Sequence, residues 1–119
     1  MAENPQKYYK VEAVIRPFML DDVKEGLKAA GFKGMTVTEA KGMGGNKITL
    51  DSFGKFSQYT VDFSPKVKLE IIVEGEATSE RVVDIVRQAS RTRYEGDGLI
   101  WVYPLSSAIQ IGDGQPYQP

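Results

Sequence analysis

The stretch that decides the fold is GMTVTEAKGMGGNK (34–47), followed by ITLDSFGKFSQYT (48–60) and VDFSPKVKLEIIVEGE (61–76). It begins as a strand pattern that breaks into glycines, loses any clear period in the middle, and returns as one long strand. A hairpin needs only about two to five loop residues, so this polar, glycine-rich insertion is too long for a simple turn and is expected to have a function. Gly42, Gly44 and Gly45 let the backbone approach a ligand closely or adopt a positive φ.

The rest of the chain supplies strands and helices around this insertion. Alternation from Tyr9 to Ile15 predicts a first strand, which Pro17 ends. A helix is predicted over 20–31, with Gly31 as its stop and Gly26 allowing the helix to pack closely on the sheet. The further predicted elements are a strand at 35–40, a strand at 59–74 bent at Pro65, a helix at 75–92 capped by Thr78 or Ser79, a strand at 99–103 stopped by Pro104, and a short fifth strand at 107–111.

The order of these elements is strand-helix-strand, insertion, strand-helix-strand. It predicts an α+β fold in which one antiparallel sheet carries both helices on one face, the ferredoxin-like βαββαβ sandwich. One domain accounts for residues 1–119, with flexible tails at 1–7 and 112–119. No third helix is predicted to cover the second face of the sheet, so we expect the chain to form oligomers.

The composition argues against several classes of function. A net charge of −1 gives no reason to expect binding to nucleic acid or to an anionic membrane surface. The chain has no cysteine and no histidine, so no metal site is expected and the usual general base is missing. Asp21 and Asp22 are adjacent on a helix and do not face one another, so an enzyme is not expected. No apolar run is long enough to span a membrane and no secretion signal is recognised, so we expect a cytoplasmic protein.

Two groups of residues have the chemistry to hold an anion. The turn Gly96–Asp97–Gly98 presents backbone N–H groups and one carboxylate, a nest that suits a phosphate, although the same tripeptide is also an ordinary turn. The second group consists of cations near the base of the insertion, Arg16, Lys41, Lys47, Lys66 and Lys68. The alternative for these cations is a solvated strand face, which is the preferred interpretation of Lys68. A further basic cluster contains Arg87, Arg91 and Arg93, of which Arg87 complements the end of a helix dipole.

With both glycine loops in view, the sequence resembles the PII signal-transduction family. The resemblance runs from about Tyr9 to Ile111 and rests on VEAVIRPFMLDDVKEGLKAAGFKGMTVTEAKGMG (11–44), YTVDFSPKVKLEIIV (59–73) and RYEGDGLIWVY (93–103). It implies a compact homotrimer with nucleotide sites in the clefts between subunits, and a regulator rather than an enzyme. The insertion, at about 43–58, would be the family's T-loop, which docks on a target transporter in a membrane or on a target enzyme.

The resemblance also implies site residues. Nucleotide contacts would come from the adenine side at Gly34, Met35 and Thr36, from the T-loop base at Gly42, Met43 and Gly44, from Lys66, and from the family's B-loop at Gly96, Asp97 and Gly98. The effector anion would lie at Gly45, Asn46 and Lys66. Tyr59 and Ser57 fall where family members are uridylylated or phosphorylated, but the surrounding loop sequence is not the usual one.

The chain departs from the family pattern where the phosphates would lie. Leu99, Gln110 and Gly112 stand where the family carries a lysine and two arginines, and Asn46 stands where it carries a glutamine. We therefore expect ADP or AMP in preference to ATP, and a small anion such as bicarbonate in place of 2-oxoglutarate. The alternatives are a conventional nitrogen-regulatory protein that binds ATP and 2-oxoglutarate, a small trimeric nucleotide-processing enzyme, and a structural trimer without a ligand.

Overall fold

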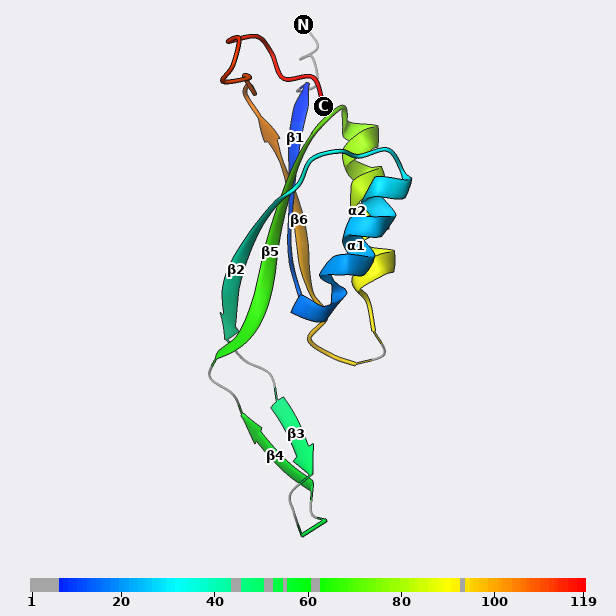
Figure 1. The fold of residues 1–119 in the computed structure, drawn as a ribbon, viewed down its shortest axis with the longest axis vertical. Helices are drawn as coiled ribbons and strands as arrows, with labels where there is room; N and C mark the ends of the chain where they lie inside the picture. Colours follow the sequence, from blue (N-terminus) through cyan, green and yellow to red (C-terminus); the bar gives the residue numbers. More distant parts are fainter. Residues whose placement is uncertain (1–6, 44–45, 51–52, 55, 61–62, 93) are drawn as a thin grey trace, which may run out of the picture.

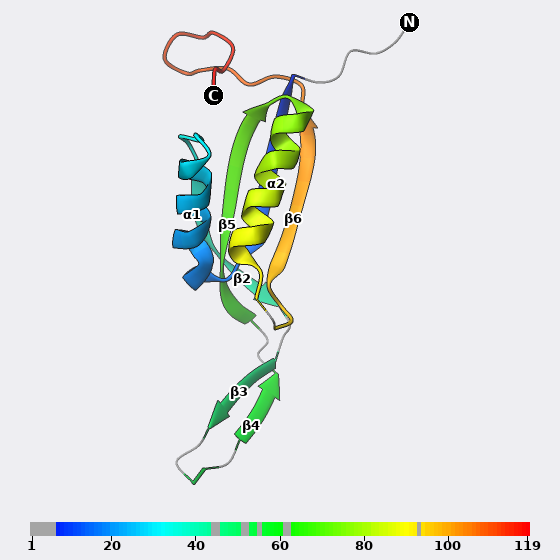
Figure 2. The same cartoon turned by 90° about the vertical axis from the view of Figure 1, so that its right-hand side faces the viewer.

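The computed structural model describes residues 7–43, 46–50, 53–54, 56–60, 63–92 and 94–119. Four antiparallel strands form one sheet in the order β2-β5-β1-β6, and two helices lie on one of its faces (Figures 1 and 2). The elements of this layer pair are β1 (Tyr8–Ile15), α1 (Leu20–Ala29), β2 (Thr36–Met43), β5 (Phe63–Glu74), α2 (Glu76–Ser90) and β6 (Gly98–Leu105). A short 3-10 turn, Pro17–Met19, follows β1 as expected from Pro17. The predicted ferredoxin-like arrangement is confirmed.

The core lies between the helices and the inner face of the sheet. Along β1 the predicted alternation places Val11, Ala13 and Ile15 in the interior, where they are at most 1 % exposed. The remaining buried members of the core are Val23, Leu27, Val67, Leu69, Ile71, Val73, Val82 and Val86. Removing these apolar side chains from water is the main force that holds the helices on the sheet.

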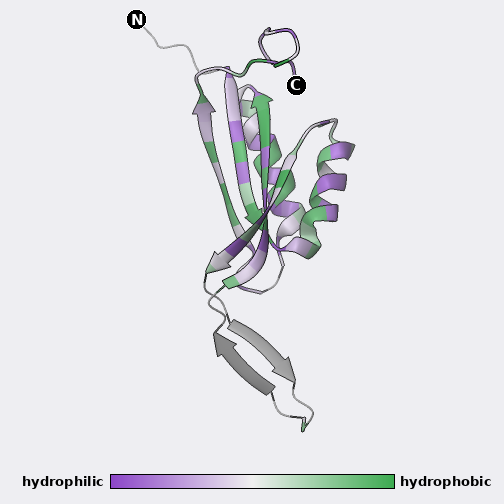
Figure 3. Cartoon of the chain, turned by 60° about the vertical axis from the view of Figure 1, so that its left-hand side comes forward, coloured by the Kyte–Doolittle hydropathy of each residue, from purple (hydrophilic) through white to green (hydrophobic). Residues whose placement is uncertain are grey.

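The two helices pack against each other as well as on the sheet. A Cβ on Gly26 of α1 would lie 3.2 Å from Ile85 Cγ2 of α2. The predicted reason for Gly26 was therefore wrong, because this glycine allows close contact between helices rather than between helix and sheet. Gly31, with a φ of 93°, follows the end of α1 as predicted. Figure 3 shows hydrophilic and hydrophobic residues alternating around both helices, the pattern of an amphipathic layer.

Proline does not end β6, contrary to the prediction. The strand continues through Pro104, which pairs with Tyr9, and ends at Leu105. Because β6 is an edge strand, a residue without an N–H is tolerated where its missing donor would face away from the sheet. Pro65 of β5 pairs with Lys41 in the same way, beyond the last pairing of β5 with β1.

The middle of the deciding stretch contains a second, two-stranded sheet. β3 (Asn46–Leu50) pairs with β4 (Phe56–Thr60), and this hairpin extends away from the main sheet (Figure 1). The sequence predicted a loop without a period here and placed the start of the following strand at Tyr59. Tyr59 instead belongs to β4, and β5 begins at Phe63. A local hairpin forms through backbone hydrogen bonds, so it needs no hydropathy period in the sequence.

The first turn of α2 begins before both predicted caps. Gly75, with a φ of 93°, precedes the helix, and its N–H donates to the carbonyl of Lys7 at 2.8 Å. Thr78 and Ser79 lie inside the helix, where the Ser79 hydroxyl donates to the Glu76 carbonyl at 2.6 Å. The predicted caps were wrong because the turn out of β5 requires a positive φ, which glycine adopts readily.

Residues 106–119, called the C-terminal strap below, cross the end of the sheet (Figure 2). The predicted fifth strand is reduced to one isolated bridge between Ile109 and Pro116. The Tyr8 hydroxyl donates to the Tyr117 carbonyl at 2.6 Å, so the strap is attached to the start of β1. The flexibility of residues 112–119 remains a prediction. In the other predicted flexible tail, residues 1–6 lie outside the described part of the chain.

The second face of the sheet carries a charged cluster. Glu12 of β1 is only 5 % exposed and accepts hydrogen bonds from the Tyr103 hydroxyl at 2.6 Å and from Trp101 Nε1 at 2.7 Å. Lys10 Nζ lies 2.9 Å from Glu12 Oε1, and Lys68 Nζ lies 3.7 Å from Oε2. The bond from Tyr103, followed by that from Lys10, lowers the pKa of Glu12 to about 2. Within the described residues no helix covers this face.

Candidate functional site

The loop that joins α2 to β6 is closed on itself by Asp97. One carboxylate oxygen accepts a hydrogen bond from the backbone N–H of Thr92 at 2.8 Å, and the other accepts from the Thr92 hydroxyl. The Thr92 oxygen in turn accepts from the Tyr94 N–H at 3.0 Å. The hydrogen bonds from Thr92, together with the charge of Arg16, hold the pKa of Asp97 below its usual value. Asp97 is therefore ionised and shapes the loop from the inside.

Arg16, which follows the last residue of β1, ties this loop to the sheet. Its guanidinium donates to the Thr92 hydroxyl at 3.0 Å and to the carbonyl of Glu95. The same group lies 3.2 Å from Asp97 Oδ1. The sequence predicted Arg16 as one of several converging cations, and the structure places it in contact with three residues of the loop.

Gly96 and Gly98 have backbone conformations that favour glycine, with φ of 88° and 123°. A Cβ on Gly98 would lie 1.9 Å from the carbonyl oxygen of Val14, so no side chain fits there. A Cβ on Gly96 would lie 3.3 Å from Arg16 Nη2. The two glycines are thus required by the close approach of the loop to β1 and Arg16.

Lys66 of β5 connects the loop to the base of the β3–β4 hairpin. Its Nζ donates to the Gly96 carbonyl at 3.3 Å. Its aliphatic chain packs against Gly42 of β2, where a Cβ would lie 3.1 Å from Lys66 Cγ. The ammonium group of Lys66 therefore contacts the loop, and the aliphatic part of the same side chain contacts the backbone near the point where the hairpin leaves the sheet.

The structure brings together half of the residues predicted for a nucleotide site, namely Gly42, Lys66, Gly96, Asp97 and Gly98. We call these five residues, with Arg16 and Thr92, the loop cluster. Sequence reasoning missed Thr92. Its signal is its place just after α2 and five residues before Asp97, because threonine hydroxyls in turns bond to nearby polar groups. The two positive charges of Arg16 and Lys66 exceed the single negative charge of Asp97, so the cluster is net positive and suits an anion.

The other predicted residues lie elsewhere. Thr36 pairs with Glu70 and Gly42 pairs with Ser64, so the two ends of β2 are about 20 Å apart along the strand. The predicted adenine side, Gly34, Met35 and Thr36, is therefore not brought to the loop cluster within one chain. Met43 ends β2 opposite Phe63, and both side chains are exposed.

Several predicted positions lie in or beside the hairpin. Asn46 begins β3, while Ser57 and Tyr59 belong to β4. Lys47 also lies in β3. Gly44 and Gly45, as well as Arg93 of the basic cluster, lie outside the described residues. Arg87 lies in the last turn of α2, where a cation was predicted.

The three positions at which the resemblance implied cations that this chain lacks are all among the described residues. Leu99 of β6 follows the loop and is 67 % exposed. Gln110 and Gly112 lie in the C-terminal strap, beyond the opposite end of β6, and the Gln110 amide lies near the Asp113 carboxylate. Because none of these three residues is positively charged, none of them supplies a cation to the loop cluster.

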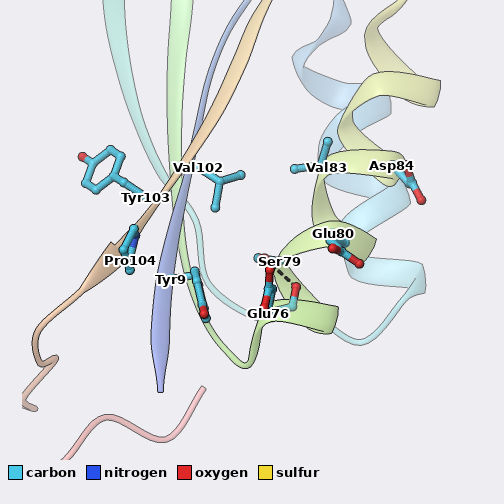
Figure 4. A pocket seen from close by; sticks show the side chains of 9 residues that line it. All are labelled: Tyr9, Glu76, Ser79, Glu80, Val83, Asp84, Val102, Tyr103 and Pro104. Carbon is cyan, nitrogen blue, oxygen red and sulfur yellow. Dashed lines mark hydrogen bonds between the residues drawn. The ribbon is translucent and has the colours of Figure 1, made fainter. Parts of the chain in front are cut away.

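Two cavities lie away from the loop cluster. One, of about 580 Å³, separates the first half of α2 from β6, and Val83 and Val102 point toward each other across it (Figure 4). Its helix side is acidic, with Glu76, Glu80 and Asp84. The other, of about 470 Å³, lies at the end of α1 and is lined by Lys24, Leu27, Lys28, Gly31, Phe32, Lys33, Gly34 and Met35.

The described part of the chain contains neither a candidate metal site nor a candidate membrane-spanning helix. Acidic residues there form no group of three or more that is placed to hold a metal ion. None of the described helices has the length and apolar character needed to cross a membrane.

The chain is similar to a known family along nearly its whole length. The family model described as nitrogen regulatory protein P-II matches residues 8–115. The chain is 46% identical to nitrogen regulatory protein P-II of Rhodospirillum rubrum over 106 residues, which cover 89% of this chain and 93% of that protein. Over the same length it is 43% identical to the corresponding protein of Rhizobium meliloti, again covering 89% and 93% of the two chains.

A solved structure agrees with these relatives. The crystal structure of Arabidopsis thaliana PII bound to citrate superimposes with a TM-score of 0.75 at 32% identity, covering 95% of this chain and 91% of that one. Fold, family model and relatives therefore give the same result. The chain belongs to the nitrogen regulatory protein P-II family.

Proposed function

We propose that this protein is a nitrogen-regulatory P-II protein that binds an adenine nucleotide at the loop cluster, with 2-oxoglutarate as its effector. Proteins of this family are signalling regulators, not enzymes, and this chain is one of them. The observation that carries the proposal is the position of Lys66, whose ammonium group touches the α2–β6 loop while its stem packs against Gly42. The names of the relatives favour this conventional role over the ADP- or AMP-specific one that the sequence predicted.

Lys66 is the group that would sense an anion. Its bond to the Gly96 carbonyl is long, at 3.3 Å, and exposed to solvent. A phosphate oxygen or a carboxylate would offer the ammonium group a charge-assisted hydrogen bond, which is about twice as strong as one to a neutral carbonyl. An arriving anion would therefore draw Lys66 away from Gly96 at little cost.

Gly42 would transmit this movement to the hairpin. The Lys66 stem fills the space where a side chain on residue 42 would lie, and β2 ends one residue later at Met43. A change in the course of Lys66 therefore alters the support of the strand end from which the hairpin departs. The hairpin, as the family's T-loop, would then present a different surface to a target transporter or enzyme.

Two chains would complete one nucleotide site. Within one chain the loop cluster and the predicted adenine-side residues near Thr36 lie at different ends of the sheet. The uncovered face of the sheet gives the chain a surface for assembly. A homotrimer would place the adenine side of one subunit beside the loop cluster of the next.

The proposal is tested by titrating the protein with ATP in a calorimeter and comparing two variants. Lys66→Met keeps an unbranched stem beside Gly42 but removes the ammonium group. We expect its ATP affinity to fall about tenfold or more, because a hydrogen bond to a charged group contributes about 1.5–3 kcal/mol. Lys7→Met, an exposed position before the start of β1 and at the opposite end of that strand from Arg16, is the matched control and should bind like the wild type. Equal ATP affinity in Lys66→Met and the wild type would overturn the proposed site.

The residues at the phosphate end favour a second candidate function. Leu99, Gln110 and Gly112 bring no cations to the phosphates, and a triphosphate needs such compensation more than a mono- or diphosphate does. In this version the protein senses ADP or AMP together with a small anion such as bicarbonate. It predicts that ADP binds at least as tightly as ATP and that 2-oxoglutarate leaves the ATP affinity unchanged. ATP binding that is clearly tighter than ADP binding, and tightened further by 2-oxoglutarate, would exclude it.

A further inference from the structure

A partly buried ion pair joins the end of β1 to the α2–β6 loop. Arg16 Nη1 lies 3.2 Å from Asp97 Oδ1, and the two side chains are only 19 % and 28 % exposed. Lys66, the other cation of the loop cluster, has different surroundings, because its ammonium group is exposed and bonds to a neutral carbonyl. An arriving anion would have to separate two opposite charges to recruit Arg16, whereas Lys66 only exchanges a neutral acceptor for a charged one.

Both carboxylate oxygens of Asp97 have partners within the loop cluster. Oδ2 accepts a hydrogen bond from the Thr92 N–H at 2.8 Å, and Oδ1 accepts one from the Thr92 hydroxyl and faces Arg16. A carboxylate repels a phosphate that lies near it, because the two groups have charges of the same sign. Asp97 can therefore favour the binding of an anion only through the shape that it gives to the loop.

Arg16 holds the loop at three points with one planar group. Its guanidinium donates to the Thr92 hydroxyl at 3.0 Å and to the Glu95 carbonyl, in addition to its contact with Asp97. Arginine presents several donors in a rigid fork, whereas lysine is a point charge on a flexible chain. A lysine at this position would therefore keep the charge of Arg16 but would lose this set of contacts.

The residue directly before Asp97 is Gly96, whose carbonyl accepts the hydrogen bond from Lys66 at 3.3 Å. We infer that Arg16 and Asp97 are positioning residues, which hold residues 96–98 in the shape that receives a phosphate and do not contact the phosphate themselves. Asp97 is then a support of the loop rather than the nucleotide contact that the resemblance implied. The inference rests on the proposed function, since it assumes that the phosphates lie at the loop cluster.

Calorimetric titration with ATP tests the inference, because charge and position predict opposite effects for Asp97→Asn. Removing a negative charge beside an anion would tighten ATP binding, whereas the loss of the ion pair should weaken it about tenfold. Arg16→Lys keeps the positive charge but loses the fork, and we expect a loss of similar size. Glu80→Gln, at an exposed position on α2, is the matched control for the removal of a negative charge and should bind ATP like the wild type.

A double-mutant cycle separates positioning from direct contact with the anion. If Arg16 and Asp97 act together on the loop, Arg16→Met combined with Asp97→Asn should weaken ATP binding about as much as either change alone, about tenfold rather than about a hundredfold. Two groups that act on the anion independently would instead give the product of the two single effects. Urea unfolding shows which variants are folded during the titration, so that a loss of affinity is not confused with a loss of folded protein.

The outcomes separate this inference from the function on which it rests. The inference would be overturned by Asp97→Asn binding ATP as tightly as the wild type or more tightly, by unchanged affinity in Arg16→Lys, or by a double variant that shows the product of the single losses. The proposed site would still stand if the wild type binds ATP and Lys66→Met weakens it. Failure of the wild type to bind ATP would overturn the proposed function and the inference together. If one of the variants does not fold, Arg16→Lys or Asp97→Asn is decisive alone.

Discussion

Gly98 occupies the position where β6 leaves the loop cluster, and no side chain fits there. Its φ of 123° is unfavourable for other residues, and a Cβ would lie 1.9 Å from the carbonyl oxygen of Val14. The sequence shows the glycine but not this contact, because Val14 and Gly98 approach one another only when β1 and β6 pair. The sequence likewise shows that Arg16 and Lys66 are basic, but it does not show that both contact the loop between α2 and β6.

Gly98→Ala should destabilise the protein strongly. The positive φ alone costs about 1–2 kcal/mol, and the contact with Val14 forces the backbone of β6 to move, so we expect a loss of about 2–4 kcal/mol. Urea unfolding followed by circular dichroism measures this change. Gly112→Ala is the control, because a Cβ on Gly112 would have no other atom within 4 Å; it should change the free energy of unfolding by less than about 1 kcal/mol. A stable Gly98→Ala protein would contradict the tight approach of β6 to β1.

Glu12 should make the stability of the protein depend on acid pH. Its pKa falls from an ordinary 4.5 to about 2 in the folded state. The stabilisation is therefore fully present above about pH 4.5 and is lost as the pH falls toward 2. Glu12→Gln should cost about 1–3 kcal/mol at pH 7, and this difference from the wild type should shrink between pH 4.5 and 2.

Unfolding in urea at several pH values and one fixed protein concentration measures the effect of Glu12. Glu80→Gln, at an exposed position on α2, controls for the loss of one negative charge. A difference between wild type and Glu12→Gln that stays constant down to pH 2 would show that the carboxylate is not stabilised as the contacts with Tyr103, Lys10 and Trp101 require.

At the scale of elements, the predicted order of the two helices and of the four strands in the main sheet is confirmed. The errors lie at the ends of these elements, in the β3–β4 hairpin, which was not predicted, and in the predicted fifth strand, which is reduced to an isolated bridge. Periodicity located β1, α1, β5 and α2, because each buries one face in the core. The strand β6 runs past Pro104 since an edge strand tolerates proline, a fact that depends on the position of β6 in the sheet. The β3–β4 hairpin was missed because its two strands pair through backbone hydrogen bonds, and the sequence there has no clear hydropathy period.

Replacing residues 46–60 by a short glycine-serine link should leave the fold intact. The main sheet and both helices are formed by residues outside this segment, and the cost of closing a loop changes slowly with its length. We expect the free energy of unfolding to stay within about 1 kcal/mol of the wild type, and ATP binding at the loop cluster to persist. Circular dichroism and calorimetry check these points, and a shortened chain that does not fold would show that the hairpin supports the sheet.

At the scale of the whole molecule, no helix among the described residues covers the outer face of the sheet. The helices protect the inner face, whereas the outer face holds Lys10, Glu12 and Lys68 beside Trp101 and Tyr103. A single chain also separates the two predicted ends of the nucleotide site. The expectation of assembly came from the number of predicted helices, whereas the way in which chains would meet depends on surfaces that form only after folding.

The chain should form a trimer in solution. Light scattering at micromolar concentration should give a mass of three times 13.2 kDa, because assembly would cover the outer face and would complete the proposed site between subunits. A mass near that of one chain would contradict both the assembly and the proposed site between subunits.

Calorimetric titration of the intact protein with ATP, with and without 2-oxoglutarate, tests the proposed regulatory site most directly. We expect about one nucleotide per chain, tighter binding when 2-oxoglutarate is present, and a loss of about tenfold or more in Lys66→Met. ADP and AMP titrations under the same conditions establish which nucleotide the site prefers. The absence of binding by all three nucleotides, or binding that Lys66→Met leaves unchanged, would contradict a nucleotide site at the loop cluster.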